Sequence, residues 1–156
     1  MKAGVRSRLA KQGDDSPRVL PCACANLRRA ARAVSQIYDE QLRGAGLNIS
    51  QFTLLQALSL AGRVTQGRLG QMLVLDSTTL TRTLRTLEAK GWIRRRPGAD
   101  RRERYVELTP GGRSRFESAL PAWNRAQKLL RARVGRRQWS GLMAELSRIA
   151  GVFSRA

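Results

Sequence analysis

The segment RRRPGADRRERY, residues 94–105, places six arginines around a Pro-Gly turn. Guanidinium groups keep their positive charge and donate several hydrogen bonds in one plane, so they suit phosphates and the edges of guanine bases. They are poor acid–base or nucleophilic catalysts because they do not lose a proton in proteins. The arginine-rich segment therefore predicts the binding of a polyanion.

The composition of the whole chain also favours a polyanionic partner. Its 156 residues include 30 Lys and Arg against 11 Asp and Glu, a formal net charge of +19. Such an excess adds self-repulsion unless a partner neutralises it. Nucleic acid is the leading candidate, and an anionic membrane is second. No apolar run approaches the roughly 18 residues of a membrane span, and no secretion signal is recognisable, so we expect a cytoplasmic protein without a membrane partner.

Residue types that would indicate an enzyme are missing. The chain has no histidine, which excludes a His-based triad, and it has no G-x-x-x-x-G-K-S/T loop for a nucleotide. Asp14 and Asp15 are adjacent, but they lie in residues 1–20, which we expect to form a flexible basic arm. Two carboxylates there would not be held in a working geometry. We predict that the chain is not an enzyme and requires no cofactor.

Hydrophobic periodicity and capping residues predict long helices on both sides of the arginines. One is expected over 22–43, and a shorter one follows a capping box at Asn48. Long helices recur over 110–134, where Pro121 should produce a kink, and over 136–153. Six apolar side chains of the last helix are expected to face inward: Trp139, Leu142, Met143, Leu146, Ile149 and Phe153.

Two short helices and a hairpin are predicted between these helices. Thr65 should cap the first short helix and Asp76 the second, which we place at 77–90. The side chains expected to face inward are Leu69, Met72 and Leu73 in the first, and Leu80, Leu84 and Leu87 in the second. After Gly91 the pattern suits two strands joined by a turn at 97–100. The arginines therefore lie on a β-hairpin that directly follows a helix-turn-helix.

A helix and an adjacent hairpin can contact neighbouring grooves of one DNA duplex. The exposed residues of the second short helix are Thr78, Thr81, Arg82 and Arg85. A major groove about 12 Å wide accepts one helix, and the hairpin tip would reach the minor groove, whose negative potential attracts arginine. The arginines expected mostly at phosphates are Arg94, Arg95, Arg96 and Arg104. Alternatively, the hairpin is a charged, solvated edge that resists aggregation.

The segment DSTTLTRTLRTLEAKGWIRRRPGADRRERYVELTPGGR resembles the recognition helix, wing and wing exit of the MarR-type winged-helix transcriptional regulators. The shared features are the D-x-R wing motif at Asp100-Arg101-Arg102 and the exit at Leu108-Thr109 with Gly112. The resemblance runs from about residue 20 to 153. It implies that Arg102 enters the minor groove, that Asp100 shapes the wing, and that the exposed helix residues face the major groove. We also assign Arg101 to DNA binding.

The predicted fold class is mainly α with a small β-hairpin, a winged helix-turn-helix with N- and C-terminal dimerisation helices. We assign 47–109 to DNA binding and 21–46 with 110–156 to dimerisation. The apolar stripes of the long helices exceed what the central domain can cover, so a second copy should cover them; the alternative is a monomer whose helices pack on each other. Two recognition helices about 34 Å apart would select a pseudo-palindromic operator.

The only cysteines, Cys22 and Cys24, begin the first helix. A helix N-terminus favours a thiolate, so these thiols could sense oxidants by forming a sulfenic acid or an intersubunit disulfide. If the segment is extended, the sulfurs align and two such pairs in a dimer could hold a soft metal. The third interpretation is two small buried side chains.

The sequence therefore predicts a regulator of transcription that binds double-stranded DNA and is associated with the nucleoid in the cytoplasm. The resemblance implies a repressor that is released by cysteine modification or by a small aromatic effector. Three aromatic residues are candidates for lining the effector pocket: Tyr38, Phe52 and Trp123. A basic winged-helix adaptor that binds RNA or another protein is the alternative.

Overall fold

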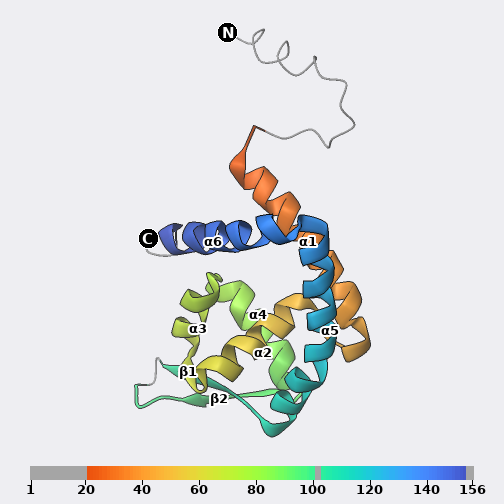
Figure 1. The fold of residues 1–156 in the computed structure, drawn as a ribbon. Helices are drawn as coiled ribbons and strands as arrows, with labels where there is room; N and C mark the ends of the chain where they lie inside the picture. The colour runs from red at the N-terminus through yellow and green to blue at the C-terminus, as the bar shows by residue number, and fades with distance from the viewer. Residues whose placement is uncertain (1–20, 101–102, 154–156) are drawn as a thin grey trace, which may run out of the picture. The chain divides into compact units, whose positions relative to one another are not determined.

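The computed structural model describes residues 21–100 and 103–153; the predicted arm at 1–20 and the predicted DNA contacts Arg101 and Arg102 lie outside the described residues. The chain divides into two units, residues 1–32 and 33–156. In the first unit, the structure describes the beginning of helix α1 (Ala23–Leu42). The second unit contains the remaining elements, which Figure 1 shows.

The elements that follow α1 come in nearly the predicted order. They are η2 (Arg43–Ala45), α2 (Ile49–Ala61), β1 (Val64–Thr65), α3 (Gln66–Leu73), α4 (Ser77–Ala89), β2 (Ile93–Pro97), β3 (Arg104–Leu108), α5 (Pro110–Val134) and α6 (Arg136–Phe153). The short strand β1 was not predicted. It pairs with β3, so the hairpin forms the larger part of a three-stranded antiparallel sheet in the order β1-β3-β2.

Each predicted helix cap is present, and each accepts a hydrogen bond from a backbone N–H in the first turn. Asn48 Oδ1 accepts from Gln51 at 2.9 Å, and the Gln51 side chain accepts from the Asn48 N–H, which completes the capping box. Thr65 caps α3 and Asp76 caps α4 in the same way. These local bonds determine where the helices of the central domain begin.

A single apolar core joins α2, α4, the sheet and α5. It contains Phe52, Leu55 and Leu58 from α2, Leu80, Leu84 and Leu87 from α4, Ile93 and Val106 from the sheet, and Phe116 from α5. The expected inward stripe of α4 is therefore confirmed. Met72 is a correction, because its side chain is 41% exposed. Leu69 and Leu73, four residues apart, occupy the core side of α3, which leaves Met72 at its margin.

Helix α6 contradicts the prediction of an inward apolar stripe. Leu142, Met143 and Leu146 are 40–43% exposed, and none of the α6 residues 136–152, whose burial the structure describes, is buried. The burial of Phe153 lies outside this description. Trp139 is half-buried and packs against the core. The chief neighbour of α6 is α5, from which Gly135 separates it, and the described part of the chain leaves Leu142, Met143 and Leu146 exposed.

Helix α5 continues through Pro121 as one element, and the expected kink stays a prediction. None of the helices in the described part of the chain is long and apolar enough to cross a membrane.

Candidate nucleic-acid interface

Helix α4 presents a polar side to solvent because its apolar residues are buried on the other side. Leu80, Leu84 and Leu87 recur at helical spacing and are at most 2% exposed. The Asp76 carboxylate accepts the Thr79 N–H at 2.9 Å, which lowers the pKa of Asp76 and places a negative charge at the positive end of the helix. A shallow surface hollow of about 460 Å³ is lined by Ser77, Thr78, Thr81, Arg82 and Arg85. The predicted groove-facing residues thus share one surface.

Thr81 differs from the other members of this set. Its hydroxyl accepts a hydrogen bond of 2.9 Å from Gln66 Nε2 at the start of α3, and its side chain is half-buried. Thr78, Arg82 and Arg85 are exposed. Sequence reasoning missed Gln66, because nothing in the local pattern indicates a contact 15 residues along the chain.

The three consecutive arginines of β2 divide between the two faces of the sheet. Side chains alternate along a strand, and Arg95 lies opposite Val106 on the face that also carries the buried Ile93. Its guanidinium binds the Glu88 carboxylate of α4, with Nε at 2.8 Å. Arg94 and Arg96 lie on the other face, opposite Glu107 and Tyr105. Arg95 is thus engaged within the chain, whereas the contact of the three arginines with phosphates stays a prediction.

The outer face of the sheet carries a basic cluster with one central carboxylate. Arg94 Nε lies 2.7 Å from Glu107 Oε1, and Arg96 Nε lies 3.7 Å from the same oxygen. The Arg63 guanidinium stacks over the Tyr105 ring at 4.3 Å. The hydrogen bond from Arg94, with the charges of Arg94, Arg63 and Arg96, lowers the pKa of Glu107.

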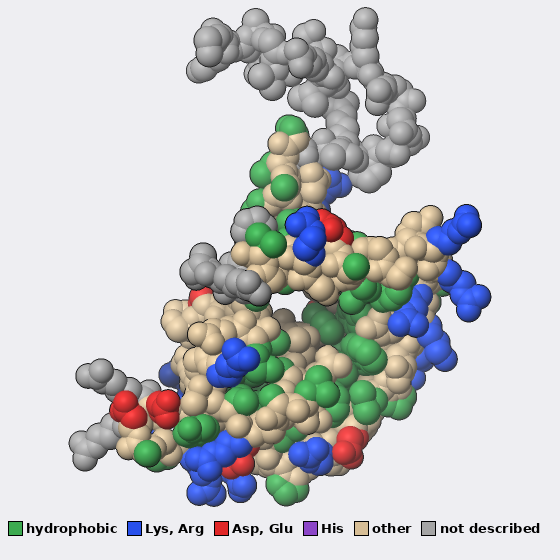
Figure 2. Space-filling view, turned by 60° about the vertical axis from the view of Figure 1, so that its left-hand side comes forward, with side chains coloured by type: hydrophobic (Ala, Val, Ile, Leu, Met, Phe, Trp, Pro, Cys, Tyr) green, Lys and Arg blue, Asp and Glu red, His purple; other side chains and the backbone are tan. Residues whose placement is uncertain are grey.

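Arg63 was missed because only the pairing of β1 with β3 brings it to this face. Figure 2 shows basic side chains gathered near the lower edge of the molecule, with acidic ones beside them.

The described part of the hairpin turn is ordered by backbone hydrogen bonds. The Gly98 N–H donates to Glu103 O, and the Glu103 N–H donates to Asp100 O, both at 2.9 Å. Arg104 is exposed and lies opposite Pro97, at the end of the strand pairing. Asp100, predicted to shape the wing, accepts through its backbone carbonyl; Arg101 and Arg102 are not described.

Comparison with known proteins assigns these elements to a family. The model of the MarR family matches residues 47–103, which include α4, β2 and the hairpin turn. The crystal structure of the M. tuberculosis transcriptional regulator MosR in complex with DNA is 36% identical and superimposes with a TM-score of 0.76, over 84% of this chain and 95% of that one. This chain belongs to the MarR family. The predicted winged helix-turn-helix fold is confirmed.

Two curated relatives are regulators from Bacillus subtilis. YwoH, an HTH-type transcriptional regulator, is 36% identical over 91 residues, which cover 58% of this chain and 66% of YwoH. YdgJ, of the same description, is 35% identical over 105 residues, which cover 67% of this chain and 64% of YdgJ. The chain thus spans slightly less than two thirds of the length of these relatives. Both are named as regulators rather than as enzymes, in agreement with the prediction that the chain is not an enzyme.

The predicted aromatic pocket is filled by its own side chains. Phe52 is fully buried, and its ring lies 5.3 Å from that of Phe116 and 5.8 Å from that of Trp123, measured between centroids. Tyr38 is 9% exposed, and burial raises the pKa of its phenol. Phe52 and Trp123 belong to the packed core rather than to an open cavity, because the rings of α5 pack directly on the Phe52 ring of α2.

A different cavity lies beside α4 in this MarR-family chain. It is a groove of about 540 Å³ between α4 and the start of α2. The α4 side chains that line it are Thr79, Arg82, Thr83 and Thr86, and further lining residues include Ser35, Gln51, Leu54 and Leu75. Arg82 therefore borders both this groove and the exposed hollow on α4.

The cysteines lie outside the segment that the MarR model matches. Both Cys22 and Cys24 are exposed, which corrects the interpretation that they are buried structural residues. Cys24 is in the first turn of α1, and Cys22 directly precedes that helix, where its carbonyl accepts the Asn26 N–H at 3.1 Å. Among the described residues, no group of three or more His, Cys, Asp or Glu side chains could hold a metal ion.

Proposed function

We propose that this chain is a sequence-specific transcriptional regulator that binds double-stranded DNA through α4 and the β2–β3 wing, with 47–109 as the DNA-binding domain. The observation that carries the proposal is the exposed set Thr78, Arg82 and Arg85 on a helix whose opposite side is buried. Helix α4 also contacts β2, which makes the wing its neighbour. The MosR complex with DNA supports this use of the fold. Such a regulator would reside in the cytoplasm at the nucleoid.

We further propose a homodimer built from 21–46 and 110–156. Exposed apolar side chains on α5 and α6 support it: Leu129, Leu142 and Leu146 are each more than a third exposed, and apolar side chains grouped on a surface mark an interaction site. Figure 2 shows hydrophobic side chains grouped on one face of the molecule. Two recognition helices about one DNA turn apart would then select a pseudo-palindromic operator. Analytical ultracentrifugation of the purified chain measures this state directly.

We also propose that the chain is a repressor, which a small-molecule effector or cysteine modification releases from DNA. The groove beside α4 supports a small-molecule site better than the filled aromatic cluster does, because it has about 540 Å³ of space. Arg82 would be drawn toward an aromatic anion in the groove and away from DNA.

The exposed thiols of Cys22 and Cys24 support the second route, in which a sulfenic acid or intersubunit disulfide changes the spacing of the two α4 helices. Mass spectrometry after peroxide treatment, alongside titration with a soft metal, separates thiol oxidation from metal binding.

Selection of bound fragments from genomic DNA tests the proposal. Arg85→Ala is expected to relax sequence choice, and Arg102→Ala to weaken binding at all A/T-flanked sites, each by about 1–3 kcal/mol. Arg133→Ala, in the last turn of α5, is the control that removes one positive charge from outside the proposed DNA-binding domain. Equal losses for all three variants on every duplex would instead support a general basic adaptor for RNA or protein.

A further inference from the structure

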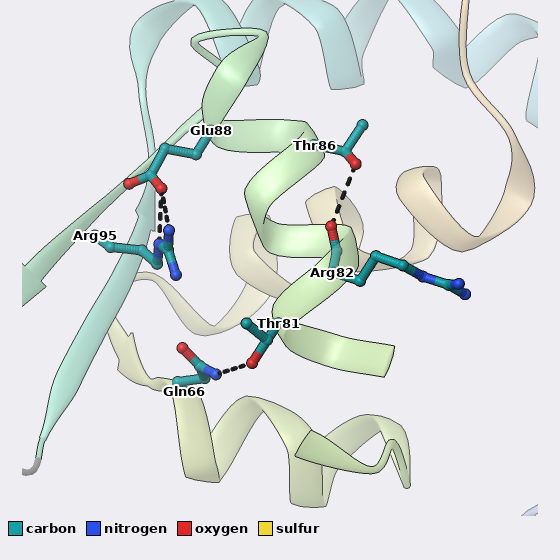
Figure 3. A network of polar contacts seen from close by, with 6 residues as sticks. All are labelled: Gln66, Thr81, Arg82, Thr86, Glu88 and Arg95. Atoms are coloured by element: carbon teal, nitrogen blue, oxygen red, sulfur yellow. Dashed lines mark hydrogen bonds and ion pairs between the residues drawn. The ribbon is translucent and has the colours of Figure 1, made fainter. Parts of the chain in front are cut away.

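Helix α4 is held along one edge by two side-chain contacts from different elements. Gln66 of α3 donates to the Thr81 hydroxyl at 2.9 Å, and Arg95 of β2 donates to the Glu88 carboxylate, with its Nε at 2.8 Å. Thr81 and Glu88 are seven residues apart, about two turns, so they lie on the same side of the helix. Figure 3 shows both contacts on this side, which we call the anchored edge of α4 (Thr81 and Glu88).

On the opposite edge, two threonine hydroxyls bond to backbone carbonyls of α4 itself. The Thr83 hydroxyl donates to Thr79 O at 3.0 Å, and the Thr86 hydroxyl donates to Arg82 O at 3.2 Å. In Figure 3 the Arg82 side chain points away from the anchored edge. Of these four side-chain contacts, only the two at the anchored edge join α4 to other elements, so only these two can fix how α4 is rotated relative to α3 and β2.

The pair of Glu88 and Arg95 joins the helix to the wing. Arg95 has a second N–H on the same carboxylate oxygen, and the two side chains are 35% and 28% exposed, so water screens them only in part. The hydrogen bond from Arg95 lowers the pKa of Glu88, so the carboxylate stays ionised at neutral pH. Two donors on one charged acceptor restrict direction as well as distance.

The pair of Glu107 and Arg94 is similar in chemistry but differs in what it connects. Both of its members lie in the hairpin, whose strands are already joined by backbone pairing from Ile93↔Leu108 to Pro97↔Arg104. Breaking it leaves the hairpin intact. Breaking the pair of Glu88 and Arg95 removes the charged connection between two different elements.

We propose that Glu88 is a positioning residue for DNA recognition, which acts through Arg95 to hold the wing at a fixed angle to α4. The proposal rests on the proposed DNA-binding function. It predicts an effect whose sign is opposite to that of simple electrostatics. A carboxylate near a polyanion weakens binding, so its neutralisation alone would strengthen it. If Glu88 positions the wing, its neutralisation should instead weaken DNA binding, because a wing that is free to move loses conformational entropy when it binds.

The test compares Glu88→Gln with Glu107→Gln in the full chain. Both variants remove one negative charge and replace a carboxylate that binds β2 arginines, Arg95 for Glu88 and Arg94 with Arg96 for Glu107, by a neutral amide. On an operator selected with the wild type, Glu107→Gln should bind equally well or more tightly, whereas Glu88→Gln should bind roughly tenfold more weakly, the factor that about 1.4 kcal/mol represents. Hydroxyl-radical footprinting should show loss of the minor-groove protection at the wing, with the major-groove contacts of α4 retained.

A charge-swapped variant, Glu88→Arg with Arg95→Glu, keeps the net charge and can restore the connection. It should recover most of the wild-type affinity and the wing footprint. The proposal is overturned if Glu88→Gln binds as tightly as Glu107→Gln, or if the swapped variant folds by circular dichroism and binds no better than Glu88→Gln. Failure of the wild type itself to bind any duplex would instead reject the proposed function.

Discussion

Replacing Gly112 with alanine tests how closely α5 packs against the base of the wing. Gly112 is buried in the first turn of α5, and a Cβ atom at this position would lie 1.8 Å from Trp92 O and 2.7 Å from Trp92 C. Because real Cβ atoms essentially never come closer than 3.0 Å to such an atom, the carbonyl or the helix must move by 1.2 Å. The neighbour is backbone, so no side-chain rotation relieves the contact.

The Trp92 carbonyl is not free to move by this amount. It accepts the Thr109 N–H at 3.0 Å, and the Thr109 hydroxyl in turn donates to Gly91 O at 2.6 Å and accepts the Gly112 N–H at 3.0 Å. Overpacking costs about 1–3 kcal/mol, and a weakened hydrogen bond adds about 1 kcal/mol. Alanine regains about 1 kcal/mol of helix propensity. With the contact this short, we expect a net destabilisation of about 2–3 kcal/mol.

Urea unfolding followed by circular dichroism measures this change, with all variants at one protein concentration because association shifts apparent stability. Gly111→Ala is the matched control. Its Cβ would lie 3.7 Å from Thr109 Oγ1 and 3.8 Å from Gly91 O, both ordinary contacts, so it should stabilise the chain by up to about 1 kcal/mol. If Gly112→Ala is as stable as Gly111→Ala, the close packing of α5 on Trp92 is refuted.

Three further predictions concern the core, the helix caps and pH. Phe52→Ala should lower the free energy of unfolding by about 3–5 kcal/mol, since it empties a fully buried site between two rings; a loss under about 1 kcal/mol in urea titration would contradict this. Asn48→Ala should cost about 1 kcal/mol in the same assay, because it removes the capping box of α2; an unchanged urea midpoint would argue against it. Arg95 lowers the pKa of Glu88 in the folded state. The pair of Glu88 and Arg95 therefore contributes its full stabilisation above the pKa of an unfolded glutamate, about 4.3, and loses it as pH falls through the lower folded pKa. The difference in unfolding free energy between wild type and Glu88→Gln should therefore shrink toward acid pH; a constant difference from pH 7 to 3 would contradict it.

Local features of the fold could be predicted from the sequence because their causes are local. A cap needs only a short polar side chain within three residues of a backbone N–H, which is why Asn48, Thr65 and Asp76 were found. The buried stripe of α4 follows from helical periodicity, and that stripe also identifies the exposed residues Thr78, Arg82 and Arg85.

The sequence alone could have predicted that the β2 arginines point to different faces of the sheet, but this prediction was not made. Arg95 shares its strand face with Ile93, and this two-residue spacing already separates it from Arg94 and Arg96. Its partner Glu88 could not be found in this way, since only the packing of α4 on the sheet brings the two side chains together. Arg63 likewise reaches the Tyr105 ring because β1 pairs with β3.

The sequence by itself determined which side chains are apolar, where helices begin, and that the chain carries a large positive charge, because these depend on residue type and short spacing. Tertiary structure decided what each surface faces. Periodicity makes the apolar stripes of α4 and α6 look alike, yet the α4 stripe is buried whereas Leu142, Met143 and Leu146 of the α6 stripe are exposed, because a stripe is covered only where another element packs against it. The same reason separates the filled aromatic cluster at Phe52 from the open groove beside Arg82.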